Sequence, residues 1–212
     1  PGGLFLQSDV AAGLAVAGHS EWVPLDVTDE ISILAFSESV AAAHGGVDVL
    51  VNNAGIMDTR ALADETVAGW DLTMAVNLRG PFLMAKHLVP LMEGRADPAI
   101  VNIGSIEGLG ANTFHSSYAA SKAGVHGLTR ALAVELGPDN IRVNCIAPGL
   151  VKTDFAKALW DTPEAEKRSS ANNPLRRLGE PDDIAGAAVF LAAKAGSWMT
   201  GQAIVVDGGS TC

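Results

Sequence analysis

Cysteine, positive charge and long apolar runs are all scarce in this sequence. The 212 residues include two cysteines, which are too few to predict a disulfide framework or a cysteine-based metal site. The five histidines are scattered without the spacing of metal ligands. The formal net charge is −10, whereas a surface that binds nucleic acid is normally basic. We therefore expect no bound metal and no nucleic-acid partner.

The longest apolar stretches are too short to cross a membrane. The richest, Ala185–Ala193, is interrupted by Gly186 and falls well short of the roughly 18 residues that a spanning helix needs. The sequence shows no pattern of a secretory signal peptide. We therefore expect a cytoplasmic protein without a membrane partner, in which Cys145 is a buried thiol in an apolar strand.

The composition that remains is that of one packed domain. Apolar residues make up 48% and charged residues 18% of the chain. We see no internal repeat and no domain boundary, so residues 1–212 are expected to form a single domain with a sizeable core.

Strand-like and helical patterns alternate along the chain. Strands are expected at Leu4–Ser8, Trp22–Leu25, Val47–Val51, Ala99–Ile103, Ile141–Ile146 and Ala203–Val206. Helices are expected at Asp9–Ala17, Asp29–Ala43, Glu65–Met92, Ser117–Leu136, where Gly137 and Pro138 end the helix, and Pro181–Ala193. Residues 147–180 form a long connection with helical pieces. This alternation predicts an α/β fold with a parallel sheet covered on both faces.

Tyr118 and Lys122 have the spacing of a reactive pair. Residues four apart on a helix lie on one face, so the ammonium can approach the phenol oxygen. A nearby cation favours the phenolate and lowers the phenol pKa from about 10. The hydroxyl of Ser105 can hold a carbonyl oxygen while Tyr118 transfers a proton. The alternative is a surface tyrosine and lysine on an amphipathic helix.

Several further residues follow directly after predicted strands. Asp26, Asn53, Ser105 and Pro148 lie just past strand ends, and ligands of open α/β sheets bind beyond the carboxyl ends of the strands. These residues are therefore expected to meet along one crevice. The alternatives are an aspartate that ends a strand, an ordinary Asn/Gly turn and a plain loop.

The order of these motifs resembles one family. Asp26-Val27-Thr28-Asp29, Asn52-Asn53-Ala54-Gly55, Asn77, Ser105, Tyr118, Lys122 and Pro148-Gly149-Leu150-Val151-Lys152-Thr153 occur in this order, and Gly201-Gln202 and Asp207-Gly208-Gly209 follow. Together they are similar to the short-chain dehydrogenase/reductases, which are NAD(P)-dependent oxidoreductases with a doubly wound, Rossmann-like fold. The resemblance covers nearly the whole chain and implies hydride transfer between a nicotinamide and a small secondary alcohol or carbonyl compound.

The resemblance also implies roles for individual residues. Tyr118 would be the general acid/base, Lys122 would lower its pKa and hold the ribose, and Ser105 would position the carbonyl oxygen. Asn77 would hold a water in a proton relay, or would be only a helix-surface amide. The cofactor-binding positions implied by the resemblance are Asp26 and Val27 at the adenine, Asn53, Ala54 and Gly55 beside the cofactor, and Pro148, Gly149, Val151 and Thr153 around the nicotinamide and phosphates, together with Tyr118 and Lys122.

The sequence departs from the family at its start. The glycine-rich phosphate loop T-G-x-x-x-G-x-G is absent, and residues 2–10 align with the family's second strand, so roughly 30 residues of the first βα unit are expected to be missing. In this alignment Asp9 accepts hydrogen bonds from the ribose and favours NAD over NADP, although NADP stays open; alternatively Asp9 only caps a helix. A second hypothesis is an inactive fragment or a non-catalytic docking subunit.

The resemblance further implies self-association. Helices corresponding to residues 65–92 and 117–136 pair between subunits in this family, and a homodimer or homotetramer is expected for the complete protein. The second helix carries a series of small and apolar residues that would allow close helix packing: Ala120, Ala123, Gly124, Gly127, Leu128, Ala131 and Leu132. The alternative is that this series packs only on its own sheet.

Two residues near the predicted site are left outside it. Glu107 follows Ser105 by two positions and His115 precedes Tyr118 by three. We expect both to face solvent from a loop; the alternative is that either lines a substrate pocket. The connection 147–180 is expected to close over the substrate.

Overall fold

The computed structural model describes residues 23–171 and 173–212. The predicted strand Leu4–Ser8, the predicted helix Asp9–Ala17 and the candidate cofactor residue Asp9 lie outside the described residues, as does Trp22.

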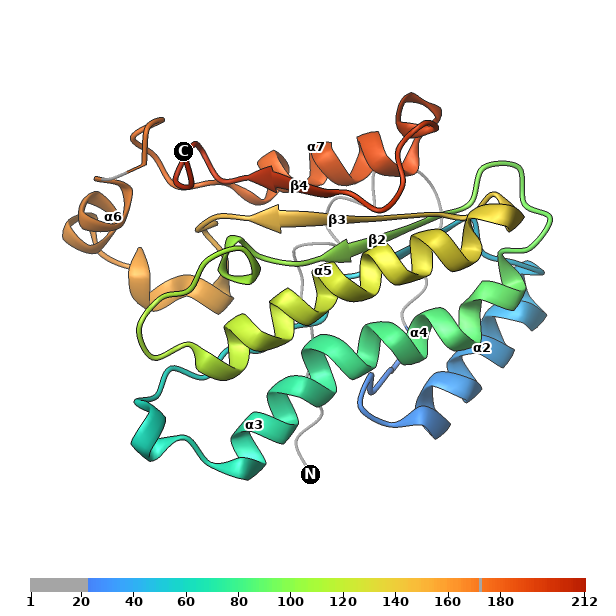
Figure 1. The fold of residues 1–212 in the computed structure, drawn as a ribbon, viewed down its shortest axis with the longest axis horizontal. Helices are drawn as coiled ribbons and strands as arrows, with labels where there is room; N and C mark the ends of the chain where they lie inside the picture. The colour runs from blue at the N-terminus through green and yellow to red at the C-terminus, as the bar shows by residue number, and fades with distance from the viewer. Residues whose placement is uncertain (1–22, 172) are drawn as a thin grey trace.

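The described core is a four-stranded parallel sheet (Figure 1). Its strands are β1 (Val49–Asn52), β2 (Ala99–Ile103), β3 (Arg142–Pro148) and β4 (Ala203–Val206), hydrogen-bonded in the order β1-β2-β3-β4. Asn52 is in register with Asn102, and Asn102 with Cys145. The predicted parallel α/β sheet is confirmed, and the carboxyl ends of its strands lie along one edge.

One predicted strand is not found. Val23–Leu25, the described part of the strand predicted at Trp22–Leu25, lie outside any strand. A strand is defined by hydrogen bonds to a neighbouring strand, and none of the strands within residues 23–171 and 173–212 pairs with these residues. Among the described residues, β1 likewise pairs on one side only, and its Val49 and Val51 side chains are 38% and 47% exposed.

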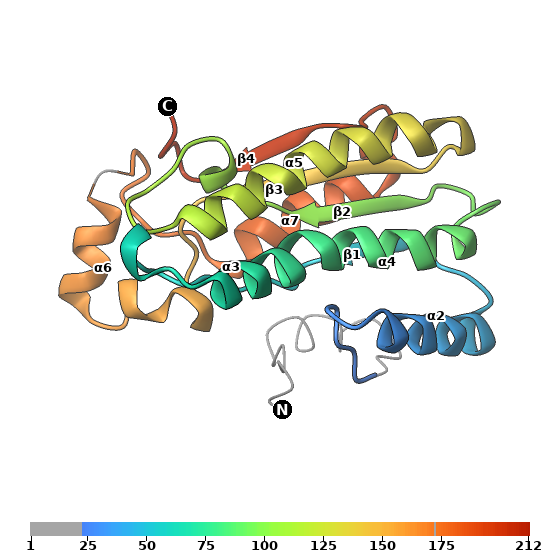
Figure 2. The ribbon, with the colours of Figure 1, turned by 60° about the horizontal axis from the view of Figure 1, so that its bottom comes forward.

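Helices cover both faces of the sheet. In Figures 1 and 2, α4 (Gly80–Leu88) runs beside α5 (Ser116–Leu136), with α2 (Glu30–His44) next to α4 and α7 (Pro181–Ala192) across the sheet. Ile100 and Val143 pack into the core beneath α4 and α5, whereas Val101 and Ile146 pack on the α7 side. Successive strand residues therefore point to opposite, equally apolar faces, as expected for a buried parallel sheet.

Local signals explain where most helices begin and end. Asp29 caps α2 by accepting a hydrogen bond from Ile31 N, and Gly45 ends the helix in the left-handed conformation at φ 69°. Glu180 and Asp183 form a capping box around Pro181 at the start of α7. The end of α5 differs from expectation, because Gly137 keeps helical angles in a short 3₁₀ turn and the left-handed residue is Asn140, at φ 59°.

The long helical stretch predicted at Glu65–Met92 contains a local irregularity. It consists of α3 (Val67–Met74), a π-helical segment (Ala75–Arg79), α4 and a 3₁₀ turn (Val89–Leu91). Single π-helical turns within α-helices often occur at functional sites. Here the π-helical segment contains the buried Asn77, one of the candidate site residues.

The connection 147–180 is held together by contacts within itself. It contains a 3₁₀ segment (Asp154–Leu159) and α6 (Pro163–Ser170), and Val151 forms a parallel bridge with Gly179. The Lys152 ammonium lies 2.6 Å from a carboxylate oxygen of Glu166.

The described residues contain neither a membrane-spanning helix nor a metal-binding cluster. None of the helices there combines the length and apolar character needed to cross a bilayer. No cluster of three or more histidine, cysteine, aspartate or glutamate side chains within the same residues is arranged to hold a metal ion.

Candidate active site

A row of buried amides lies just below the carboxyl edge of the sheet. Asn52 Nδ2 donates to Asn102 Oδ1 at 2.9 Å, and Asn102 Nδ2 donates to Thr129 Oγ1 at 3.0 Å. These bonds join the ends of β1 and β2 to the middle of α5. The residues that follow the strands, including Asn53 and Ser105, are therefore placed on a rigid base.

Ser105 and Tyr118 come together at this edge. Ser105 follows β2, is 7% exposed and caps a 3₁₀ turn by accepting a hydrogen bond from Glu107 N at 3.1 Å. Tyr118 lies in the first turn of α5 and is 8% exposed. The Ser105 hydroxyl is within hydrogen-bond reach of the Tyr118 phenol oxygen. The two hydroxyl groups can thus contact the same substrate oxygen.

The Tyr118 phenol has a raised pKa in this structure. Burial is the largest cause, a hydrogen bond with Ser105 opposes it, and the negative charge of Glu107 reinforces it. This direction is opposite to the expected lowering by Lys122. The physical reason is that removal of the phenol from water disfavours the phenolate, although the Lys122 ammonium lies 5.6 Å from the ring centroid.

Lys122 is a buried ammonium group. Its residue is 4% exposed, and its Nζ donates to the Ile103 carbonyl oxygen at 2.8 Å. Burial lowers the pKa of Lys122 to about 8. Because Lys122 lies one helical turn after Tyr118, it is close to the phenol as predicted, and with a pKa of about 8 most of the amine still carries its proton at pH 7.

Asn77 is held between the site and the helices behind it. Its Nδ2 donates to the Ile56 carbonyl at 2.9 Å and to Ser121 Oγ at 3.0 Å, while its Oδ1 accepts from Ile56 N at 2.8 Å. Asn77 is 1% exposed, so it is not a helix-surface amide. It fixes the segment after β1 against α5.

Small residues leave room beside Lys122. A Cβ on Gly55 would lie 3.5 Å from Lys122 Nζ and 3.7 Å from Asn77 Oδ1. Ala54 and Gly55 are half-buried. An ammonium has three N–H donors, and the Ile103 carbonyl takes one. The others suit the ribose hydroxyls of a nicotinamide cofactor, so the residues at this part of the edge fit that group.

The turn after β3 forms the opposite wall. Pro148, Gly149, Val151 and Thr153 are all half-buried. A Cβ on Gly149 would lie 2.7 Å from Asp207 Cβ, so only glycine fits where these two segments cross. Thr153 precedes the 3₁₀ segment, and its carbonyl accepts from Trp160 Nε1 at 3.1 Å. These residues are in place to flank a ligand. Their contacts within the protein do not by themselves identify them as cofactor-binding residues.

The predicted adenine-binding pair has local partners of its own. The Asp26 carboxylate accepts hydrogen bonds from Thr28 N at 2.8 Å and Thr28 Oγ1 at 2.7 Å, which lower the pKa of Asp26. Val27 lies 3.2 Å from the position of a Cβ on Gly80 and packs into the core. Within the described residues, no glycine-rich loop connects a strand to a helix at this side of the site.

Glu107 and His115 do not face solvent as predicted. Their side chains are 11% and 18% exposed, and His115 Nδ1 lies 3.3 Å from Glu107 Oε1. The His115 ring packs edge-on to Tyr118 with centroids 6.4 Å apart, and Phe155 lies 6.2 Å from the same ring. Sequence reasoning missed these contacts because they depend on how residues 106–115 fold back. The only feature of the sequence that could have indicated these contacts was the nearness of Glu107 to Ser105 and of His115 to Tyr118.

A second buried polar group lies below Lys122. His126 and Cys145 are 4% and 0% exposed, and His126 Nε2 has no hydrogen-bond partner within residues 23–171 and 173–212. Burial raises the pKa of Cys145 to about 11, and burial with the charges of Arg130 and Lys122 lowers the pKa of His126. The expected burial of Cys145 is confirmed. The one sequence feature that could have placed His126 beside the site is its position four residues after Lys122 on the same helix.

Gly104 is the point where these two side chains meet the site. A Cβ there would lie 2.5 Å from His126 Nε2 and 2.6 Å from Cys145 Sγ. Gly104→Ala is therefore expected to lower the free energy of unfolding by about 1–3 kcal/mol, the usual cost of overpacking. Chemical denaturation measures this change. Gly110→Ala is the matched control, because no atom lies within 4 Å of its Cβ position. Equal stability of both variants would show that His126 and Cys145 can move aside.

Comparison with known proteins shows which sequences this chain resembles. Residues 6–211 match the family described as enoyl-(acyl carrier protein) reductase. The chain is 44% identical over 168 residues to the human protein "Dehydrogenase/reductase SDR family member 4", covering 79% of this chain. It is 42% identical over 205 residues to the cis-4-hydroxycyclohexanecarboxylate dehydrogenase of Sinomonas cyclohexanicum, covering 96% of this chain and 82% of that protein.

Solved structures have a similar fold. A gluconate 5-dehydrogenase from Burkholderia cenocepacia, crystallised with NADP and tartrate, superposes with a TM-score of 0.84 at 34% identity, covering 88% of this chain and 73% of that one. The sequence match with the human "Dehydrogenase/reductase SDR family member 4" spans 60% of that protein's length. The fold, the order of the motifs and these similarities lead to one conclusion: the chain belongs to the short-chain dehydrogenase/reductase family.

Proposed function

We propose that this protein transfers a hydride between a nicotinamide cofactor and a small secondary alcohol or carbonyl compound. The observation that carries the proposal is the group formed by Ser105, Tyr118 and Lys122 at the carboxyl edge of the sheet. Two buried hydroxyl groups stand within reach of one another, and a buried ammonium lies 5.6 Å from the phenol ring. This combination supports proton transfer to or from a substrate oxygen.

Each residue has a separate task in the proposed reaction. Ser105 donates a hydrogen bond to the substrate oxygen and holds it next to Tyr118. During reduction the Tyr118 hydroxyl gives its proton to that oxygen, and during oxidation the phenolate takes the proton back. The raised pKa of Tyr118 keeps the proton donor loaded at neutral pH. A bound nicotinamide supplies or accepts the hydride.

Lys122 and Asn77 act behind the reacting atoms. The Lys122 ammonium stabilises the phenolate and donates to the cofactor ribose. Asn77 keeps the segment Ala54–Ile56 against α5 and offers the polar surroundings of a proton relay. Asn53, Ala54, Gly55, Pro148, Gly149, Val151 and Thr153 are proposed to line the cofactor, with Asp26 and Val27 at its adenine end. The proposed preference for NAD over NADP rests on Asp9, so both cofactors are to be tested.

Titration with NADH separates this proposal from the alternative of a non-catalytic docking protein. Binding is measured by nicotinamide fluorescence, and turnover by the absorbance of NADH or NADPH with a panel of secondary alcohols. Saturable binding with turnover supports the enzyme. A chain that neither binds NADH nor turns over any alcohol would favour an inactive fragment or a non-catalytic docking subunit.

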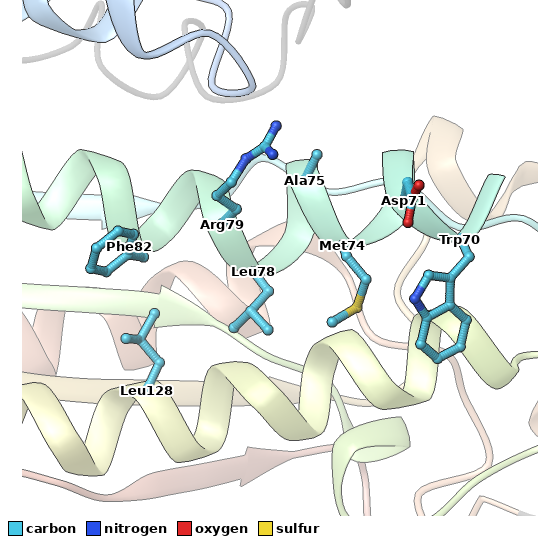
Figure 3. Close-up of a pocket in the computed structure, with 8 residues that line it drawn as sticks. All are labelled: Trp70, Asp71, Met74, Ala75, Leu78, Arg79, Phe82 and Leu128. Carbon is cyan, nitrogen blue, oxygen red and sulfur yellow. The ribbon is translucent and has the colours of Figure 1, made fainter. Parts of the chain in front are cut away.

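We also propose that the protein self-associates through α3, α4 and α5. An apolar groove of about 700 Å³ lies between these helices. Figure 3 shows Met74 and Leu78 pointing from one side toward α5, and Leu128 pointing back. Trp70 and Phe82 at the groove are 37% and 46% exposed. A second copy of these helices would cover this apolar surface.

The small residues of α5 support the same contact. Its buried residues, such as Val125 and Thr129, are on the side facing the sheet, whereas Ala123 and Ala131 are exposed. No atom lies within 4 Å of a Cβ on Gly127. This part of the face leaves room for a neighbouring helix, whereas Gly124, whose Cβ would lie 2.7 Å from Leu78 Cδ2, already packs against the chain's own helices.

Gly127→Arg is expected to reduce the oligomer to a monomer, because a long charged side chain would occupy the proposed contact. Sedimentation velocity at micromolar concentration measures the change. Gly110→Arg adds the same charge on an exposed loop and is expected to leave the oligomer intact. A wild-type monomer, or an unchanged oligomer in Gly127→Arg, would contradict the proposed interface.

A further inference from the structure

The Glu107 carboxylate is held rigidly next to the reacting groups. Its Oε2 accepts a hydrogen bond from Asn112 N at 3.0 Å. Its Oε1 accepts a hydrogen bond from the Asn112 side-chain amide and lies 3.3 Å from His115 Nδ1. With its side chain only 11% exposed, Glu107 has exchanged most of its water for two donors from Asn112 and the contact with His115. We call Glu107, Asn112 and His115 the Glu107 clamp.

The clamp contacts both candidate catalytic residues, the Ser105 hydroxyl and the Tyr118 ring. The main-chain N–H of Glu107 donates to Ser105 Oγ at 3.1 Å. The His115 ring packs edge-on to the Tyr118 ring, with an angle of 76° between the planes. The charge of Glu107 is felt at the Tyr118 phenol, whose ionisation it opposes. A substrate oxygen held by Ser105 and Tyr118 therefore lies near this carboxylate.

The carboxylate retains capacity for a further donor. An ionised carboxylate has about four lone-pair sites, and the clamp uses three of them. A hydroxyl group on the substrate can donate to the remaining one. A second carboxylate or a phosphate would instead place like charges together in a partly buried site, which is unfavourable.

We propose that Glu107 determines substrate specificity by accepting a hydrogen bond from a hydroxyl on the carbon next to the reacting one. The preferred substrates are accordingly neutral, polyhydroxylated compounds, and anions at the neighbouring carbon are disfavoured. This role rests on the oxidoreductase function proposed above. The Glu107 clamp is fixed before the substrate binds, so little ordering is needed to form the bond.

The test compares three oxidations with matched carbon skeletons: cyclohexanol, the vicinal diol of cyclohexane, and cyclohexanol bearing a carboxylate on the neighbouring carbon. The protein is expressed from its complete reading frame and assayed with NAD or NADP. Wild type is expected to have its highest kcat/KM with the diol. Glu107→Gln is expected to lower the diol-to-cyclohexanol ratio about tenfold, because a hydrogen bond to a charged acceptor becomes one to a neutral acceptor. In Glu107→Gln the kcat/KM for the carboxylate compound is expected to rise relative to that for the diol.

Two further variants make the result specific. Asn112→Ala leaves the charge of Glu107 in place but removes one donor, so the ratio is expected to fall by less. Glu93→Gln removes an exposed carboxylate away from the Glu107 clamp and is expected to leave the ratio unchanged.

Folding of every variant is checked by its thermal transition. A ratio that is the same in wild type, Glu107→Gln and Asn112→Ala would overturn the role of Glu107 while leaving the oxidoreductase intact. No turnover of any probe by wild type would overturn the oxidoreductase proposal and this role with it.

Discussion

Tyr118→Phe is expected to lower kcat by about 10²–10⁴, the usual contribution of a general acid or base. The substitution removes one hydroxyl and keeps the ring that packs between His115 and Phe155. The measurement is steady-state oxidation of a secondary alcohol, followed by NADH absorbance. Because the chain contains a single tyrosine, no other phenol can replace the lost proton donor.

Two controls separate chemistry from structure in this variant. The affinity for NADH, measured by nicotinamide fluorescence, is expected to change little, because the phenyl ring is retained. The thermal transition is expected to stay close to that of wild type. Turnover within a few fold of wild type, with both controls satisfied, would remove Tyr118 from the acid/base role.

Lys122→Met is expected to stabilise the fold while it impairs turnover. The Lys122 pKa is lowered from 10.5 to about 8 by burial, a difference of about 3 kcal/mol between the charged and neutral forms. At pH 7 the buried ammonium therefore costs stability that methionine would not cost. The variant also loses the hydrogen bond to the Ile103 carbonyl, which lowers its expected stabilisation by about 1 kcal/mol. We expect a net increase of about 1–3 kcal/mol in the free energy of unfolding.

The pH dependence of this difference has a defined sign. Between about pH 8 and 10.5 the unfolded chain binds the Lys122 proton more tightly than the folded chain does. Wild-type stability therefore rises with pH through this window relative to Lys122→Met, and the advantage of the variant fades. The unfolding free energies of both proteins are compared from pH 7 to pH 10.5, which cancels the titration of other groups.

Lys194→Met is the matched control for the lysine experiment. Lys194 is exposed after α7, so its replacement is expected to change stability by no more than about 0.5 kcal/mol at any pH in the window. A destabilised Lys122→Met, or a difference from wild type that does not vary with pH, would show that the ammonium is well solvated or strongly paired in the folded protein.

These two predictions show a conflict between stability and the proposed chemistry. The site buries an ammonium, a phenol, a thiol and an imidazole with an unpartnered nitrogen within one region of α5 and β3. Groups of this kind are costly to bury unless they are paired. Their retention in the core is consistent with selection for the reaction rather than for folding.

Much of the fold follows from patterns within short stretches of sequence. Apolar strands such as Ala99–Ile103, alternating with helices, determined the parallel sheet, because side-chain periodicity is set by local backbone geometry. The same reasoning placed the polar residues after the strand ends along one edge. The spacing of Tyr118 and Lys122 also determined that they share one face of α5, since that depends only on helical geometry.

The tertiary structure decided what depends on distant neighbours. The direction of the Tyr118 pKa shift follows from burial, which the spacing to Lys122 cannot reveal. The solvent-shielded Glu107 clamp depends on the fold of residues 106–115, which the nearness of Glu107 to Ser105 in the sequence does not reveal. Local geometry is encoded in a few successive residues, whereas desolvation and strand pairing are sums over atoms that the chain brings together only when it folds.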